Sequence, residues 1–283
     1  MLIAVTGSTG FLGRQVAVGL RSAGHEVRGL DNRSGTDGAT DRVVDLRDPA
    51  ATRASLEGCE AIVHLAGYPR AGEHDPHDVF TTNTGIVFAV VQAALDLNIG
   101  LLVNISSLSA LGYPFYVRPI TPEYLPIDED AGTTPQDAYG LSKAVGEDIV
   151  TAAVLQSGGA LAAVSLRMPW LQSPESFWCD IPGTVDSDMG LRNLWGYLDT
   201  RDAADAVAAV FGRDNVGHTR LFVAADDTFS EKETGQLIAQ SLPGVELRHP
   251  LTGNSSLIST AAARDYLGFR PQYSWRSYSR TAA

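Results

Sequence analysis

Apolar residues follow two patterns along the chain up to Arg167. Short apolar runs predict strands at 2–5, 26–30, 42–44, 61–65, 101–105 and 161–166. Apolar residues at helical spacing predict helices at 11–23, 75–97 and 136–156. Strands that alternate with helices form a parallel sheet covered by helices on both faces. The pattern therefore predicts an α/β fold built on a doubly wound parallel sheet.

The pattern changes after Arg167. Residues 169–197 are rich in Pro, Gly, Trp and Asp, and they predict irregular structure. Further elements are predicted at 200–211, 221–224, 230–241 and 257–267. We expect 169–197 and 225–283 to form a small C-terminal substrate-binding subdomain. Residues 198–224 are expected to return to the sheet domain formed by 1–168.

A glycine turn joins the first predicted strand to the first predicted helix, in Gly7-Ser8-Thr9-Gly10-Phe11-Leu12-Gly13. Gly7 permits a tight turn, Gly10 lets the main chain approach a pyrophosphate, and Gly13 lets the helix pack closely on the strand. The helix N-terminus then faces the negative charge. The turn therefore predicts a Rossmann-type dinucleotide-binding domain.

An acidic residue closes the second predicted strand. Asp31 lies 18 residues after Gly13, where a carboxylate accepts hydrogen bonds from the adenosine ribose and repels a 2′-phosphate. Arg33 stands two residues further on, where an arginine can pair with that phosphate or remain a solvated loop side chain. We expect NAD as the cofactor rather than NADP.

Two residues after the third predicted strand are candidates for the adenine site. Asp45 and Leu46 could flank the adenine with an acid and an apolar side chain. The alternative is a helix N-cap region ahead of Pro49. The sequence leaves both interpretations open.

A tyrosine and a lysine stand four residues apart near the start of the helix at 136–156. Tyr139 and Lys143 share one helix face, and an ammonium near a phenol is expected to lower the pKa of the phenol. Such a phenol can exchange a proton with an alcohol near neutral pH. Ser107 follows a predicted strand at the sheet edge where sites form, and its hydroxyl can hold a substrate oxygen. Together with the glycine turn, this set predicts a redox enzyme.

These motifs resemble the extended short-chain dehydrogenases/reductases, the NAD-dependent epimerase/dehydratase family. The resemblance covers nearly the whole chain, and its segments are Val5–Gly13, Leu30–Asn32, Ile62–Gly67, Ile105–Ser107, Tyr139–Lys143, Asp199–Ala206 and Leu267–Pro271. It implies that Ser107, Tyr139 and Lys143 form the catalytic set. Tyr139 would be the acid/base, and Lys143 would also hold the nicotinamide ribose.

The resemblance also implies that Ala66 and Gly67 line the cofactor and that Asn83 lies beneath the active site. The expected cofactor contacts are Gly7, Thr9, Gly10, Phe11, Leu12, Gly13, Asp31, Asn32, Arg33, Asp45, Leu46, Leu65, Ala66, Gly67, Asn83, Tyr139 and Lys143.

The substrate region departs from family members that act on nucleotide sugars. Trp170 stands three residues after Arg167, where those members carry an asparagine. The stretches 106–114 and 191–195 are instead similar to uronate dehydrogenases, which oxidise a free sugar acid. Expected substrate contacts are Ser109, Trp170 and Arg192.

Arg192 corresponds by that resemblance to an arginine that pairs with the substrate carboxylate. The alternative is a surface arginine paired with Asp186 or Asp188. Aromatic residues nearby either line the pocket or pack the core of the subdomain, and they are Phe115, Tyr116, Phe177, Trp178, Trp195 and Tyr197.

The expected activity is an NAD-dependent hydride transfer between nicotinamide and a secondary alcohol or ketone of a sugar, sugar acid or other cyclic small molecule. One alternative is an NAD-dependent epimerase or dehydratase of sugars or nucleotide sugars. Another is a non-catalytic NAD-sensing module, against which the intact Ser107, Tyr139 and Lys143 argue. The resemblance implies a homodimer through the helices at 75–97 and 136–156.

Composition and charge exclude several classes of binding partner. The net charge is −12 with no basic run, which argues against nucleic acids and anionic membrane surfaces. Cys59 and Cys179 form no CxxC pair, and His74 and His77 are expected in a solvated loop and helix start, so no metal site is predicted. Because the glycine turn begins at residue 7, we expect no signal peptide, and we expect no apolar run long enough to span a membrane. We expect a cytoplasmic protein with reduced thiols.

Overall fold

A seven-stranded sheet forms the centre of the computed structural model, which describes residues 1–35, 42–184 and 187–279. The strands lie in the order β10-β7-β5-β4-β1-β2-β3, and every neighbouring pair is parallel. Their bounds are β1 Leu2–Thr6, β2 Glu26–Asp31, β3 Arg42–Val43, β4 Ala61–His64, β5 Leu101–Ser107, β7 Ala162–Met168 and β10 His218–Phe222. The predicted strands are all present, with β10 beginning three residues earlier than expected.

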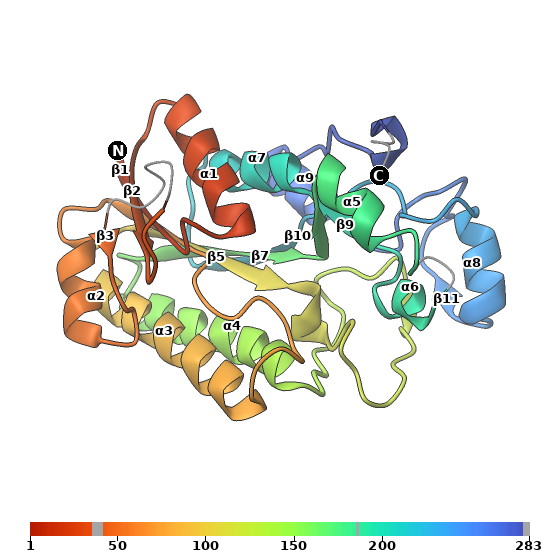
Figure 1. The fold of residues 1–283 in the computed structure, drawn as a ribbon, viewed down its shortest axis with the longest axis horizontal. Helices are drawn as coiled ribbons and strands as arrows, with labels where there is room; N and C mark the ends of the chain where they lie inside the picture. Colours follow the sequence, from red (N-terminus) through yellow and green to blue (C-terminus); the bar gives the residue numbers. More distant parts are fainter. Residues whose placement is uncertain (36–41, 185–186, 280–283) are drawn as a thin grey trace.

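Helices cover both faces of the sheet (Figure 1). On one face lie α1 Phe11–Ser22, α7 Thr200–Val210 and α9 Ala261–Leu267. On the other lie α2 Pro49–Leu56, α3 Pro76–Asp96 and α4 Ala138–Gln156. This arrangement confirms the predicted Rossmann-type, doubly wound α/β fold.

Burial explains why the central strands are continuous apolar runs. Ile3, Ala4 and Val5 are completely buried, because helices pack on both faces of β1. In α1 the buried side chains Leu12, Val16 and Leu20 recur every four residues, so that helix buries one stripe against the sheet.

The strand order reverses between β1 and β4. From β1 the sheet grows outward through β2 and β3 on one side and through β4, β5, β7 and β10 on the other. Ligands of open α/β sheets bind beyond the carboxyl ends of the strands at such a reversal. The glycine turn follows β1 directly, so the fold places it at this point.

The segment 169–197 is more regular than expected. It contains β8 Trp170–Gln172, α5 Pro174–Asp180, α6 Asp188–Arg192 and β9 Tyr197–Asp199, and β8 pairs with β9 in parallel. Serine and proline act there as helix-start signals, since Ser173 caps α5, Pro174 occupies its first turn and Ser187 caps α6.

A second core cluster joins distant stretches of the chain. It includes side chains of 169–197 and 225–279, and also residues between 108 and 127. The remaining elements are η1 Leu108–Leu111, β6 Tyr124–Leu125, α8 Thr234–Ser241, β11 Glu246–Leu247 and η2 Trp275–Ser277. The boundaries of the substrate-binding subdomain stay a prediction.

Several aromatic rings pack against one another in this second cluster. Phe177 stacks on Trp275 with ring centroids 5.1 Å apart. Of the six aromatic residues considered for the pocket, four are buried in the cluster: Tyr116, Phe177, Trp195 and Tyr197. For these four, packing of the core is the interpretation that the structure supports.

The expectation that no apolar run reaches the length of a membrane span was wrong for α3. This helix has 21 residues and a mean hydropathy of 1.3 over its most apolar window. Core helices of folded proteins often reach the same length and hydropathy, and α3 packs against α2 and α4. The helix is therefore weak evidence for a membrane location.

Candidate functional site

The glycine turn leaves no room for a side chain at Gly7 or Gly13 and little room at Gly10. A Cβ on Gly13 would lie 2.1 Å from the carbonyl oxygen of Gly7, and one on Gly7 would lie 2.9 Å from the amide nitrogen of Ala66. A Cβ on Gly10 would lie 3.1 Å from the Gly7 oxygen. Gly7 also has φ +70°, which favours glycine. The turn thus forms a backbone cradle against the loop after β4.

The N-terminus of α1 faces this cradle without a side-chain cap. Gly10 is the N-cap residue, and the first turn contains no acidic residue. By contrast, α2, α3 and α4 are capped by Asp48, Asp75 and Asp137. Free N–H groups and the helix dipole favour an anion at such a terminus. The residues present therefore fit the pyrophosphate of a dinucleotide.

Asp31 closes this cradle from β2. Its Oδ2 accepts hydrogen bonds from the Thr9 amide at 3.0 Å and from the Thr9 hydroxyl at 2.7 Å. Its Oδ1 accepts from the Arg33 amide at 3.2 Å. The carboxylate is 7% exposed, so it is fixed next to the turn. Asn32 and Arg33 are exposed beside it.

Other expected cofactor residues differ in their surroundings. The Asp45 carboxylate is paired with Arg47, with Nη2 to Oδ2 at 2.6 Å, and Leu46 is buried. The hydrogen bonds from Arg47 hold the pKa of Asp45 below its ordinary value. The cap of α2 is Asp48 rather than Asp45. At the start of α1, Phe11 is 56% exposed, whereas Leu12 packs into the core.

The loop after β4 is held from two sides. The Thr6 hydroxyl oxygen accepts hydrogen bonds from the amides of Leu65 at 3.1 Å and Ala66 at 3.2 Å. From α3, Asn83 accepts from the Tyr68 amide at 2.7 Å, and it blocks any side chain at Gly67, whose Cβ would lie 2.8 Å from its Oδ1. Asn83 is buried, so it fixes this loop from beneath.

Ser107, Tyr139 and Lys143 meet at the carboxyl end of β5. The Ser107 hydroxyl lies close enough to the Tyr139 phenol to lower its pKa, and the Lys143 Nζ lies 5.7 Å from the centroid of the Tyr139 ring. Lys143 Nζ also donates to the carbonyl oxygen of Ile105 at 2.8 Å. Asp137 caps α4 by accepting from the Gly140 amide at 2.9 Å, which sets the start of the helix. The structure therefore brings the three predicted catalytic residues together.

The pKa of Tyr139 does not follow the expectation from sequence. Burial raises the pKa of this phenol to about 12, while the hydrogen bond with Ser107 lowers it and the charge of Asp137 raises it further. Burial also lowers the pKa of Lys143 to about 8, against the charge of Glu147, which raises it. The expected lowering of the phenol pKa by Lys143 was wrong, because desolvation is the larger effect here.

A cavity of about 280 Å³ opens beside Tyr139. Apolar and small residues dominate its wall, and its lining includes Ala71, Gly72, His74, Pro76, Val79 and Val117. His74 stacks on Tyr68 with centroids 4.2 Å apart. The cavity gives a small molecule room next to the phenol.

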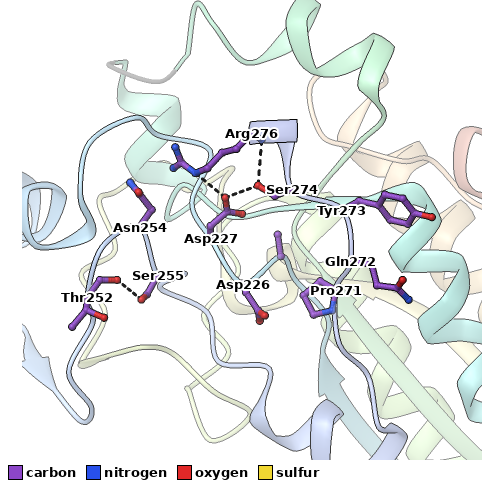
Figure 2. A pocket seen from close by; sticks show the side chains of 11 residues that line it. Asp226, Asp227, Thr252, Asn254, Ser255, Pro271, Gln272, Tyr273, Ser274 and Arg276 are labelled. Carbon is purple, nitrogen blue, oxygen red and sulfur yellow. Dashed lines mark hydrogen bonds and ion pairs between the residues drawn. The ribbon is translucent and has the colours of Figure 1, made fainter. Parts of the chain in front are cut away.

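A second, more open depression of about 420 Å³ lies in the C-terminal part of the chain (Figure 2). Its Asp227 carboxylate is already hydrogen-bonded within the protein, since Oδ2 accepts from Arg276 Nε at 3.0 Å and from the Ser274 hydroxyl at 2.8 Å. Among the described residues, none of the expected catalytic or cofactor residues lines it. Within the same ranges, no cluster of His, Cys, Asp and Glu could hold a metal ion.

Of the expected substrate residues, Ser109 contacts the predicted catalytic set, whereas Trp170 packs against the second core cluster. Ser109 is buried, and its hydroxyl oxygen accepts a hydrogen bond from the Ser107 hydroxyl at 3.1 Å. It therefore supports Ser107 from behind. Trp170 is partly exposed and packs edge-on against Phe229, with centroids 6.3 Å apart.

Arg192 makes the contact expected of an arginine that pairs with Asp188, which was the alternative to a substrate contact. Its Nε pairs with Asp188 in α6, and its Nη1 donates to the Tyr116 carbonyl at 2.6 Å. Its guanidinium also lies over the Tyr116 ring, 4.2 Å from the centroid. Asp186, the other proposed partner, lies outside the described residues. Arg192 thus holds the loop that carries Phe115, whose ring packs edge-on against Tyr139.

A comparison with family models identifies the family of the chain. The NAD-dependent epimerase/dehydratase family model matches residues 3–225. The chain belongs to this family. The match spans the glycine turn, the loop after β4 and the predicted catalytic set of this epimerase/dehydratase family member.

Curated relatives of this family member include both epimerases and dehydrogenases. The chain is 27% identical to a UDP-glucose 4-epimerase of Streptomyces lividans, over 94% of this chain and 90% of that protein. It is also 27% identical to a uronate dehydrogenase of Pseudomonas putida, over 79% of this chain and 76% of that protein.

Solved structures show the same fold. A short-chain dehydrogenase/reductase superfamily protein from Agrobacterium tumefaciens, determined with bound NAD, superposes with a TM-score of 0.70. The two chains are 22% identical, and the match covers 98% of this chain and 94% of the other.

One buried residue at the site was not found from sequence. Glu147 lies one helical turn beyond Lys143 and is 2% exposed. Its spacing of four residues from Lys143 was the available signal, because that spacing continues the same helix face.

Proposed function

We propose that this chain is an NAD-dependent oxidoreductase that transfers a hydride between nicotinamide and a secondary alcohol or ketone. The observation that carries the proposal is the meeting of Ser107, Tyr139 and Lys143 at the end of β5, beside the glycine cradle. Family membership supports the cofactor, and Asp31 at the end of β2 supports NAD over NADP.

The proposed roles follow from the position of each residue. The glycine turn and the N-terminus of α1 hold the pyrophosphate, and Asp31 accepts from the adenosine ribose. The nicotinamide supplies hydride transfer when it is bound. Tyr139 exchanges a proton with the substrate oxygen, and Ser107 holds that oxygen with a hydrogen bond. The Lys143 ammonium stabilises the charge that develops on the phenol and binds the nicotinamide ribose.

We propose a free sugar, a sugar acid or another cyclic small molecule as the substrate. The cavity beside Tyr139 and the presence of Trp170 in place of an asparagine support a compact substrate. The uronate dehydrogenase relative supports a sugar acid. The epimerase relative supports the second candidate, an epimerase that returns the hydride within one turnover.

We also propose a cytoplasmic homodimer formed through α3 and α4. Large apolar side chains are exposed on these two helices, at Phe88 (56%), Leu141 (43%) and Leu155 (75%). Light scattering coupled to gel filtration tests this assembly, and Leu155→Glu should produce a monomer.

A substrate panel tests the activity. Purified protein with NAD is mixed with sugars, sugar acids and cyclic alcohols, and NADH is followed by its absorbance. Net NADH formation supports the dehydrogenase. Conversion of a sugar or nucleotide sugar to its epimer, detected by NMR without net NADH, supports the epimerase. Bound NAD with neither reaction would point to the NAD-sensing module.

A further inference from the structure

A buried carboxylate continues the row of catalytic side chains on α4. Glu147 follows Lys143 by four residues, as Lys143 follows Tyr139, so these side chains lie along one helix face. Glu147 is 2% exposed. A carboxylate at this depth requires partners that replace its lost hydration.

Its partners come from three adjacent strands of the sheet. Glu147 Oε1 accepts from the Ser106 hydroxyl at 2.6 Å and from Arg167 Nε at 3.0 Å. Oε2 accepts from Arg167 Nη2 at 2.8 Å and from Arg220 Nε at 2.9 Å. Ser106, Arg167 and Arg220 belong to β5, β7 and β10, so a single carboxylate ties α4 to three strands.

Three consecutive residues of β5 contact this row of α4. The pairs are Ile105 with Lys143, Ser106 with Glu147, and Ser107 with Tyr139. Because the contacts are consecutive, a shift of the helix at Glu147 also moves the phenol relative to Ser107. The ion pairs of Glu147 with Arg167 and Arg220 therefore fix how Tyr139 and Lys143 lie against the end of β5.

We propose that Glu147 is a positioning residue: locked by Ser106, Arg167 and Arg220, it fixes α4 on β5 and keeps the Lys143 ammonium in place as a cation. The link to catalysis rests on the proposed function, whereas the effect on Lys143 does not.

The charges around Lys143 agree with this role. Burial raises the pKa of Glu147, but the hydrogen bonds and charge of Arg167, with Ser106 and Arg220, outweigh burial and lower it overall. Glu147 is then an anion, and its charge raises the pKa of Lys143 against burial.

Other titratable or charged groups around Lys143 come from α4 and its neighbouring strands. Tyr139 lies on α4 itself, and His64 on β4 is held neutral because burial lowers its pKa to about 3. The guanidiniums of Arg167 on β7 and Arg220 on β10 are paired with Glu147. They repel Lys143 once the carboxylate is gone.

The sequence makes a direct measurement possible, because it contains two lysines, Lys143 and Lys232. Protein labelled with ¹³C at the lysine ε-carbon should give two NMR signals that are titrated with pH. Glu147→Gln removes the charge at nearly constant shape, so the Lys143 midpoint should fall by about one pH unit or more. The Lys232 signal is the internal reference and should titrate as in the native protein.

Ser106→Ala is the matched control. It removes one hydrogen bond to Glu147 and leaves the carboxylate charge, so the Lys143 midpoint should stay at its native value. A Glu147→Gln protein whose Lys143 titrates like the native residue overturns the proposal and makes Glu147 a structural ion pair only.

Glu147→Gln leaves two arginines without their anion and can fail to fold. A second comparison covers that case. Arg167→Met leaves Glu147 bonded to Ser106 and Arg220, and the double variant Glu147→Gln/Arg167→Met removes a buried pair together. The Lys143 midpoint should be lower in the double variant than in Arg167→Met alone. Equal midpoints overturn the proposal.

Activity provides a separate readout. Where the substrate panel identifies a reaction, Glu147→Gln should lower kcat at least tenfold and move the high-pH limb of kcat to lower pH, while Ser106→Ala keeps the native pH profile. An unmoved limb contradicts the positioning role. Absence of turnover in the native protein contradicts the proposed function, and the NMR titration still decides the role of Glu147.

Discussion

Thr9 and Asp31 are joined by two hydrogen bonds to the same carboxylate oxygen, 3.0 Å from the Thr9 amide and 2.7 Å from its hydroxyl. Thr9 belongs to the glycine turn, and Asp31 ends β2. The acid proposed to bind the ribose is therefore also a brace for the turn proposed to bind the pyrophosphate. A change at either residue affects both parts of the proposed cofactor site.

Asp31→Ala should weaken NAD binding about tenfold or more and narrow or reverse the preference over NADP. The carboxylate no longer repels a 2′-phosphate, and Arg33 can then pair with it. Isothermal titration with both cofactors measures the two affinities. Thr9→Val is the matched control, because it removes the 2.7 Å bond and keeps the carboxylate, so the preference for NAD should persist. A native protein that binds NADP more tightly than NAD contradicts this role of Asp31.

Tyr139→Phe should reduce kcat by about 10²- to 10⁴-fold, the usual contribution of a general acid/base, while NAD affinity stays near the native value. The reason is that the ring still packs against Phe115 and only the hydroxyl is lost. Tyr113→Phe removes a buried phenol of the second core cluster and should leave kcat within about twofold. More than about a tenth of native kcat in Tyr139→Phe removes this residue from the mechanism.

The sequence was sufficient for features that depend on neighbours along the chain. The glycine turn, the alternation of strands and helices, and the pair Tyr139 and Lys143 each fall within a short segment, where spacing and local geometry decide the outcome. The glycine turn after β1 and Ser107 at the end of β5 lie at the same edge of the sheet, because the carboxyl ends of parallel strands share one edge.

Features that depend on partners distant along the chain could not be predicted from the sequence. The burial of Glu147 requires Arg167 and Arg220 from two later strands. The C-terminal segment returns to α7, where the amides of Gln272 and Tyr273 donate to Asp202 at 2.8 and 3.0 Å. Charge and hydropathy along the chain carry no signal for such pairings, because each partner alone resembles a surface residue.

Two histidines, His64, which is buried, and His218, which is partly buried, predict acid sensitivity. Burial lowers the pKa of His64 to about 3 and that of His218 to about 4, whereas both take up a proton near pH 6.5 in the unfolded chain. The unfolded state thus binds more protons below about pH 6.5, so the free energy of unfolding falls as the pH drops towards these values.

His218→Gln should therefore lose less stability than the native protein between about pH 7 and about pH 4.5, measured by denaturant unfolding. His77→Gln changes an exposed histidine and should keep the native slope. Identical slopes for His218→Gln and the native protein contradict the neutral state of His218 in the folded protein.

Arg192 distinguishes a substrate contact from a support for the active-site loop. Its contacts with Asp188 and with the Tyr116 carbonyl indicate that it holds the loop carrying Phe115 against Tyr139. We expect Arg192→Ala to lower the melting temperature by a few degrees and to raise KM by a similar factor for neutral sugars and for sugar acids. A loosened loop affects every substrate that reaches Tyr139, whereas loss of a carboxylate partner affects acids alone.

Asp188→Ala completes the test, since it frees the guanidinium while leaving the bond to Tyr116 in place. If Arg192 supports the loop, Asp188→Ala should leave KM for sugar acids near its native value. If Arg192 binds the substrate carboxylate, Asp188→Ala should lower that KM, and Arg192→Ala should raise it at least tenfold for acids only, about 1.4 kcal/mol or more, with an unchanged melting temperature. That second pattern would show that the ion pair with Asp188 is the resting arrangement of a carboxylate-binding arginine.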